Sequence, residues 1–418
     1  MTEPESQNRF DIVVIGAGIV GASCALWLQL QGKKVLLVDR DEPGSGTSYG
    51  NACTIATYGC VPVNSPSLFY KLPGMLCSSQ SPLSIDIGYA IANLPWMLSF
   101  LRHCTPARVA HTTRALGSLL RHTDEGLDPL IEKSNTADLF VQNDCLYLYS
   151  TTQSFRDAQS STQARRDNGT DLQVLTRDDV LRLEPAIKLE FHRALQFKGA
   201  RHVKNPRALV SRFVKSLCAD GGRFLKEAAS EIQQHSDHVV IQTGRGQTLK
   251  ADYCVVSAGA HSRHIAGAGM ELLPLDTERG YHIQFQQHQE LLSRPVGWAD
   301  AGFYATPTNE GLRCAGTVEI GGLAKPINEK RIEYIKRMTR RLFGDLGDPS
   351  TQWLGFRPTF PDSLPMIGFA ENSNRILIAT GHHHLGLTLG GITGKVISEL
   401  ICEQKPSLDL TPFDTHRF

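Results

Sequence analysis

FDIVVIGAGIVG, residues 10–21, is the stretch that decides the fold of this chain. Its first half is a short apolar run rich in β-branched side chains, which predicts a strand buried on both faces. Its second half fits the pattern G-x-G-x-x-G. Helical apolar spacing follows over residues 22–31, and a second apolar run covers 34–39. The sequence therefore predicts a β-α-β unit.

The glycines of this unit have separate physical tasks. Gly16 permits a tight turn, Gly18 lets a pyrophosphate approach the backbone, and Gly21 lets the helix pack on the strand. The helix N-terminus then offers free N–H groups to the phosphates. Asp39 ends the next predicted strand, where its carboxylate can accept hydrogen bonds from ribose hydroxyls. We interpret the unit as a dinucleotide-binding site.

The choice between NAD and FAD rests on the loop Gly-Thr-Ser-Tyr-Gly-Asn-Ala at residues 46–52. Small and hydroxyl-bearing residues directly after the second strand suit the diphosphate and ribityl chain of a flavin, which extend past the glycine turn. A polar surface loop is the alternative. The 37 glycines in 418 residues exceed the average usage of about 7 % and gather at such turns.

Composition excludes several classes of protein. The 43 basic and 42 acidic side chains give a net charge of +1, which argues against a nucleic-acid binder that works by bulk charge. The ten cysteines form no C-x-x-C pair, which argues against a zinc site. No apolar run is long enough to span a membrane, and residues 1–9 lack the apolar core of a signal peptide. These features favour a cytoplasmic protein of two or three domains.

Proline and glycine residues mark the ends of further predicted helices and strands. We expect helices over 205–219, 328–343 and 386–402, and strands over 238–243, 253–257 and 375–379, with β character through 279–318. The expected class is α/β (α+β).

Three C-terminal blocks extend the pattern: Trp-Leu-Gly-Phe-Arg-Pro at 353–358, Pro-Asp-Ser-Leu-Pro at 361–365, and Thr-Gly-His-His-His-Leu-Gly-Leu-Thr at 380–388. With the N-terminal fingerprint, the 46–52 loop, and Arg-Gly-Tyr at 279–281, the chain resembles the D-amino-acid oxidase family of FAD-dependent oxidoreductases. It is most similar to the bacterial D-amino-acid dehydrogenase branch. The likeness spans the whole chain in the family's order.

The resemblance implies two interleaved domains. A discontinuous Rossmann-like FAD-binding domain of the glutathione-reductase type would take residues 1–60, 200–272 and 352–418. A substrate domain with a mixed β-sheet and helices would take residues 61–199 and 273–351. By the same resemblance, the contacts to FAD fall on Gly16, Gly18, Gly21, Asp39, Arg40, Thr47, Ser48, Asn51, Ala52, Ala229, Ala258, Gly259, Gly355, Gly386, Leu387 and Thr388.

Arg357 is the expected partner of the substrate carboxylate, because a planar guanidinium can bind a carboxylate through two hydrogen bonds. A salt bridge from Arg357 to Asp362 is the alternative. Tyr281 and Tyr304 are expected to add hydroxyl donors to the same carboxylate, or else to be core residues.

The three consecutive histidines at 382–384 suggest a metal site, but neighbouring side chains on one short segment cannot all reach one ion, so we predict no metal. Similar dehydrogenases often have glycine at position 383, so we expect His383 to face the substrate and shape specificity. His261 also departs from the family, where an aromatic residue is commoner. Cys53 is the candidate for a covalent flavin link.

The implied reaction is transfer of a hydride from the substrate Cα–H to the flavin, which gives an imine. The expected substrate is a D- or cyclic amino acid such as proline or hydroxyproline, with electrons passed to a quinone or another acceptor. An oxidase of glycine or sarcosine type, a subunit of a multi-component dehydrogenase and a flavin-binding protein without turnover stay open as alternatives.

Residues 87–123 contain no Asp or Glu, and arginines alternate there with Trp, Phe and Leu side chains. Such composition is typical of a helix that lies on a membrane surface. We therefore expect peripheral association with the cytoplasmic face of the inner membrane, or else a helix packed inward.

Overall fold

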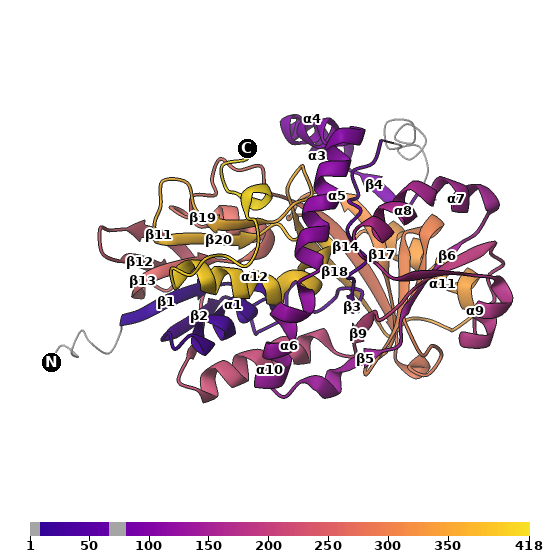
Figure 1. Ribbon diagram of the computed structural model, residues 1–418, viewed down its shortest axis with the longest axis horizontal. Helices are drawn as coiled ribbons and strands as arrows, with labels where there is room; N and C mark the ends of the chain where they lie inside the picture. The colour runs from indigo at the N-terminus through magenta and orange to yellow at the C-terminus, as the bar shows by residue number, and fades with distance from the viewer. Residues whose placement is uncertain (1–8, 67–80) are drawn as a thin grey trace.

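The computed structural model describes residues 9–66 and 81–418, and its main elements form two β-sheets with helices around them (Figure 1). The first sheet has eight strands in the order β10-β2-β1-β13-β12-β11, with β20 beside β13 and β19 beside β20. Its strands are β1 (Arg9–Ile15), β2 (Val35–Asp39), β10 (Arg223–Lys226), β11 (Ala229–Gln234), β12 (Val239–Thr243), β13 (Thr248–Val256), β19 (Met366–Phe369) and β20 (Ile376–Thr380). Strands from three distant parts of the chain thus share one sheet.

The N-terminal β-α-β unit is confirmed. β1 runs parallel to β2 and β13, and helix α1 (Ile19–Leu30) connects β1 to β2. Helix α12 (Gly386–Ile401) lies beside α1 and also contacts α6 (Thr123–Lys133). A Cβ on Gly391 would come within 2.7 Å of the Gly126 backbone, so these helices approach at glycine. Helix α10 (Pro206–Ala219) packs on the other side of α1.

The second sheet has nine strands in the order β18-β14-β17-β16-β15-β6-β8-β7, with β4 beside β17. Its strands are β4 (Leu83–Ile85), β6 (Cys145–Tyr149), β7 (Leu172–Leu175), β8 (Arg193–Phe197), β14 (Asp276–Phe285), β15 (Val296–Trp298), β16 (Phe303–Thr308), β17 (Gly311–Ile320) and β18 (Thr351–Thr359). The amphipathic helix α11 (Glu329–Phe343) buries its apolar side chains with those of β14 and β17. The β character predicted for 279–318 and the helix predicted for 328–343 are therefore confirmed.

The remaining elements join the two sheets. A small sheet combines β3 (Thr54–Ile55), β5 (Phe140–Gln142) and β9 (Arg201–Val203). Helices α3 (Ile87–Ala92), α4 (Leu94–Arg102) and α5 (Pro106–Leu120) lead from β4 to α6, and α7 (Thr152–Asp157), α8 (Gln159–Asp167) and α9 (Arg177–Leu183) flank β6–β8. The α/β class is as predicted. β18, which the expected boundary at residue 352 gave to the FAD-binding part, pairs with β14 in the second sheet. The division into two domains stays a prediction.

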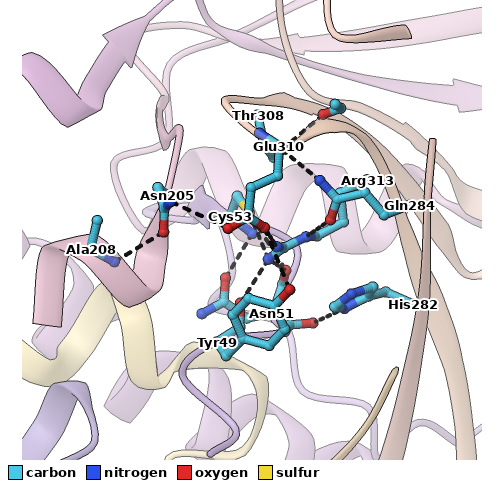
Figure 2. A network of polar contacts seen from close by, with 12 residues as sticks. Tyr49, Asn51, Cys53, Asn205, Ala208, His282, Gln284, Thr308, Glu310 and Arg313 are labelled. Atoms are coloured by element: carbon cyan, nitrogen blue, oxygen red, sulfur yellow. Dashed lines mark hydrogen bonds and ion pairs between the residues drawn. The ribbon is translucent and has the colours of Figure 1, made fainter. Parts of the chain in front are cut away.

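A buried arginine fixes the loop of residues 46–53, which we call the clamp loop, against the second sheet. Arg313 on β17 is 1 % exposed, and its Nη1 donates to the Tyr49 carbonyl at 2.7 Å and lies 3.4 Å from the Asn51 carbonyl. Its Nη2 pairs with Glu310 at 3.2 Å. Figure 2 shows how the guanidinium occupies the centre of this network. The clamp loop is thereby joined to the second sheet by charge-assisted hydrogen bonds.

Neighbouring strands complete the attachment of the clamp loop. His282 Nδ1 lies 2.9 Å from the Gly50 carbonyl, and Thr306 Oγ1 donates to the Ala52 carbonyl at 2.9 Å. At the other end Thr47 Oγ1 donates to the Phe356 carbonyl at 2.8 Å. Strands β14, β16, β17 and β18 therefore each hold one part of the loop.

Replacing Arg313 by methionine should destabilise the protein by about 3 kcal/mol. Hydrogen bonds to charged groups contribute roughly 1.5–3 kcal/mol each, and the buried carbonyls would lose their donor. Urea unfolding followed by tryptophan fluorescence measures the change. Glu310→Gln is the matched control, because this partner is 36 % exposed and should cost less than about 1 kcal/mol. Equal losses in the two variants would contradict the role given to Arg313.

Candidate active site

One cavity of about 1040 Å³ runs along both sheets and is lined by residues of each. Nearly all the site residues expected from the sequence line it, from the glycine turn after β1 to Arg357 on β18. Gly21 and Thr388 are the two that do not. Gly21 lies under the glycine turn, where a Cβ would come within 1.8 Å of the Gly16 carbonyl, and Thr388 accepts a hydrogen bond from the Ala56 N–H. Both residues support the cavity from behind.

The glycine turn has the geometry of a phosphate-binding loop. Gly16 has a φ of +107°, and a Cβ there would come within 2.4 Å of the Ser257 carbonyl. Helix α1 has Gly18 as its N-cap, which supplies no side-chain cap, so its first turn faces the cavity with backbone alone. Ser48 Oγ of the clamp loop accepts from the Ile19 N–H at 2.9 Å. An anion at this turn would meet N–H groups and the positive end of a helix dipole.

Asp39 stands at the end of β2 as the sequence predicts. Its carboxylate accepts from the Ala17 N–H at 2.6 Å and the Asp41 N–H at 2.9 Å. Burial raises the pKa of Asp39, and these two hydrogen bonds oppose the rise. Next to it, Arg40 Nη2 lies 3.0 Å from His261 Nε2. Burial and the charge of Arg40 lower the pKa of His261 to about 4, so the ring is neutral at neutral pH.

The remaining cofactor residues expected by resemblance continue along the same cavity. Ala229 begins β11, and Ala258 and Gly259 follow β13. The clamp loop supplies Thr47, Ser48, Asn51 and Ala52, and helix α12 opens with Gly386 and Leu387. Cys53 does not line the cavity; its thiol lies 3.4 Å from Arg313 Nη1. This geometry does not favour Cys53 as a covalent flavin ligand.

Side chains on β14 alternate between two faces of the strand. Glu278, Gly280 and His282 share one face, of which Gly280 lines the cavity, whereas the side chains of Arg279 and Tyr281 point to the opposite face, although Tyr281 also borders the cavity. The Tyr281 hydroxyl donates to Glu319, and Arg279 pairs with the same carboxylate at 2.9 Å. The expected role of Tyr281 as a donor to the substrate carboxylate is therefore not supported, because the strand period directs its hydroxyl away from the cavity.

Arg357 lies on β18 opposite Glu278 of β14. Its side chain is half-buried in the cavity wall, and its Nη1 donates to the Thr317 carbonyl at 3.2 Å. A Cβ on Gly280 would come within 2.4 Å of Nη2, so glycine makes room for the guanidinium. Burial lowers the pKa of Arg357 and Glu278 opposes this effect. The alternative partner, Asp362, is paired with Arg417 at 2.7 Å instead.

The three histidines face different partners. His382 Nε2 lies 2.9 Å from Thr393 Oγ1 in the core. His383 has a left-handed backbone with a φ of +53°, and its Nε2 lies 2.7 Å from Glu278 Oε2. Its Nδ1 contacts Nδ1 of His384, whose side chain is exposed to the cavity. In the part of the chain that the structure describes, no group of three or more His, Cys, Asp or Glu is arranged to hold a metal ion.

Tyr304 faces the cavity from β16 as part of an aromatic wall. Its ring stacks on Tyr147 of β6 at 5.7 Å, and Gly297 between them has no side chain to separate the rings. Tyr58 stacks on Phe197 at 3.9 Å in the same wall. The wall combines strands that are far apart in the sequence. Sequence periodicity can predict that each aromatic residue faces inward, but it cannot predict that these residues contact one another.

Arg165 of α8 is a third arginine in the cavity wall, beside Arg40 and Arg357, and sequence reasoning missed it. Its Nε donates to the Tyr58 carbonyl at 3.2 Å, and its Nη1 to Ser161 Oγ at 3.2 Å. Glu278, His384 and Arg313 were missed as well. For Glu278 and Arg313 the sequence held a usable signal, since both are charged residues inside the apolar strands 276–285 and 311–320. A charge on a buried strand needs a partner or a ligand.

The arrangement suits a large dinucleotide and a small anion in one cavity. The cavity extends from the glycine turn and Asp39 to the N-terminus of α12, where backbone N–H groups face inward. The adjoining end carries Arg357 beside Glu278 and His384. These residues fit FAD, and the guanidinium of Arg357 provides a positive charge at the adjoining end of the cavity.

Comparison with known proteins agrees with this geometry. The family model described as FAD dependent oxidoreductase (DAO) matches residues 11–400. A D-amino-acid oxidase of Bradyrhizobium diazoefficiens is 31 % identical over 99 % of this chain and 100 % of its own. Among solved structures, glycine oxidase from Geobacillus kaustophilus superposes with a TM-score of 0.76 at 21 % identity, covering 98 % of this chain and 99 % of its own. L-proline dehydrogenase from P. horikoshii gives 0.73 at 18 % identity, with 98 % of both chains covered.

The matched range contains both sheets, the cavity and Arg357. The chain belongs to the DAO family of FAD-dependent oxidoreductases, which act on amino acids and amines.

Proposed function

We propose that the protein is an FAD-dependent amino-acid dehydrogenase that oxidises the Cα–N bond of a D- or cyclic amino acid. The observation that carries the proposal is Arg357, a half-buried guanidinium in the cavity that also contains the dinucleotide-binding turn. Within the described residues, Thr317 is the one acceptor of a hydrogen bond from the Arg357 side chain, which leaves the other N–H groups for a ligand. A carboxylate is the anion whose two oxygens match this group.

The chain's own residues bind and orient the substrate. Arg357 takes the carboxylate, and the aromatic wall around Tyr304 and Tyr147 encloses the side chain. His383 remains a proposed specificity residue, with its ring buried behind His384. FAD, when bound, supplies the acceptor for the hydride from Cα. Holding the reacting atoms in one orientation can contribute roughly 7–11 kcal/mol to lowering the barrier.

The relatives are named as a D-amino-acid oxidase, a glycine oxidase and an L-proline dehydrogenase, so both acceptor types and both configurations occur among them. The enclosed aromatic wall favours a substrate with an apolar or cyclic side chain, such as proline or hydroxyproline, over glycine. An oxidase that uses O2 is the second candidate.

Anaerobic mixing with single amino acids tests the function directly. We expect a D- or cyclic amino acid to bleach the visible absorbance of the bound flavin, because the hydride goes to FAD. Readmission of air then separates the acceptors: slow reoxidation with little peroxide indicates a dehydrogenase, whereas rapid peroxide formation indicates an oxidase. Unbleached flavin with every D-, L- and cyclic amino acid would contradict the proposal.

Replacing Arg357 by methionine should lower kcat/KM for the best amino acid by about 30-fold or more, since truncating one partner of a buried charge pair costs roughly 2–5 kcal/mol. Steady-state kinetics with an artificial acceptor measures the loss. The amine of the same skeleton without a carboxylate is the matched control, and its kcat/KM should change little. A similar loss for both compounds would indicate a structural role only.

Helices α3 and α4 carry the proposed membrane contact (Figure 1). Their outer face exposes Ile87 at 69 %, Ile91 at 70 %, Leu94 at 52 % and Leu98 at 48 %. Arg102, Arg108 and Arg114 are exposed beside it, while the rest of α5 packs inward. No helix in the described ranges is long and apolar enough to cross a membrane. We propose that this face rests on an anionic membrane and gives access to a quinone.

Liposome flotation tests the membrane contact. The protein should float with phosphatidylglycerol vesicles at low salt, and Ile91→Glu with Leu94→Glu should abolish flotation by placing charge in the apolar face. Leu272→Glu is the control, because Leu272 is 99 % exposed at a separate site. Wild-type protein that stays at the bottom of the gradient would refute the contact.

A further inference from the structure

Glu278, His383 and His384 form a chain of titratable side chains that ends at the cavity. The chain starts at Glu278, which is 2 % exposed, and passes through His383, which is 4 % exposed. It ends at His384, whose ring is open to the cavity although protein surrounds it densely. Arg357 acts on both ends, since its charge influences Glu278 and His384.

The order of contacts decides where the protons are. His383 Nε2 lies 2.7 Å from Glu278 Oε2, although the N–H is not aligned as a hydrogen bond, so the attraction is electrostatic. In the neutral His383 ring, that attraction favours the proton on Nε2 and leaves Nδ1 as an acceptor. His384 Nδ1, in contact with it, is then the donor. The lone pair of His384 is therefore on Nε2.

Oxidation of an amino acid requires a group that can accept a proton from its amine. The amine is protonated near neutral pH, and the nitrogen must have a free lone pair before the C–N bond can become a double bond. With its carboxylate on Arg357, the substrate would lie within the same end of the cavity as His384.

We propose that His384 is a catalytic residue that takes the proton from the substrate ammonium, with His383 and Glu278 as positioning residues. The inference rests on the proposed function. The N–H bond of the ammonium breaks, a new N–H bond forms at Nε2 of His384, and the positive charge moves to the imidazole. The electron pair of the Cα–H bond then leaves as hydride to the flavin, and the nitrogen lone pair forms the C=N bond. The proton on His384 returns to solvent after the product leaves.

The electrostatics around His384 agree with a neutral ring. Burial lowers the pKa of His384 well below its ordinary value, and the charge of Arg357 lowers it further, as does His383 whenever that ring is protonated. Glu278 keeps a pKa below its ordinary value: burial alone would raise it, but His383 and Arg357 outweigh that effect. His382, the other neighbour, is neutral because burial lowers its pKa to about 3. His384 is thus in the form that accepts a proton.

The test compares pH profiles of flavin reduction for wild type and His384→Asn. Asparagine keeps a group near Nδ1 and removes Nε2. We expect kcat/KM at neutral pH to fall about 10²-fold, in the range of general-base effects. The ratio of wild-type to variant kcat/KM should fall about tenfold per pH unit as the pH rises toward the pKa of the substrate amine, since the substrate then binds without the extra proton. His235→Asn, an exposed histidine on a distant strand end, should match wild type.

Glu278→Gln provides a second readout. Removing the negative charge should move the acid limb of the wild-type profile to lower pH and lower the pKa of His384 measured by NMR in the resting holoenzyme. The affinity of His384→Asn for the carboxylate that has the substrate's skeleton but no amine should equal that of wild type.

The outcomes distinguish failure of the proposed function from failure of the role given to His384. If no amino acid reduces the wild-type flavin, the proposed function fails and takes the role of His384 with it. If wild type is reduced but His384→Asn is equally fast, or is slower by the same factor at every pH, only the role of His384 as a base is overturned.

Discussion

The attachment of the clamp loop to the second sheet is the interaction on which the site depends. Carbonyl groups of residues 46–53 accept hydrogen bonds from Arg313 and Thr306, and His282 approaches another of them. A loop whose carbonyls are bound on one side presents its other side to the cavity, next to the N-terminus of α1. The position of the clamp loop relative to Arg357 is therefore set by the second sheet, which also contains Arg357 on β18.

The two-residue period of β14 and β18 then decides which side chains meet. Trp353, Gly355 and Arg357 alternate with outward residues on β18, and Glu278 and Gly280 face them from β14. A side chain at position 280 would force the guanidinium to move, because a Cβ there would come within 2.4 Å of Arg357 Nη2. A slip of β18 by one residue against β14 would turn Arg357 to the opposite face and put its neighbour Phe356 or Pro358 in its place. Pairing of these two strands is thus a condition for the proposed substrate binding by Arg357.

Sequence alone could predict the first sheet's β-α-β unit, the glycine turn and Asp39, because strand, turn and helix follow one another within forty residues. It could also identify Arg357 as a cavity residue from the surrounding motif. It could not place Tyr281, since its neighbours Arg279 and Ile283 share its face and only the sheet shows that this face meets α11. Arg313, Glu278 and Arg165 were missed for a related reason: each acts through partners that are distant in sequence, such as Tyr49 for Arg313.

The charges at the substrate end have a further consequence for the proposed reaction. Arg357 lowers the affinity of His384 for a proton before any substrate arrives. A carboxylate bound to Arg357 would compensate that charge and so raise the proton affinity of His384 at the moment when the ammonium must release its proton. The negative charge of Glu278, which acts on both His383 and Arg357, is present before the substrate binds, so it does not produce this change. Binding of the carboxylate and activation of the amine are in this way coupled through one guanidinium, which explains why an acid and two imidazoles are placed around it.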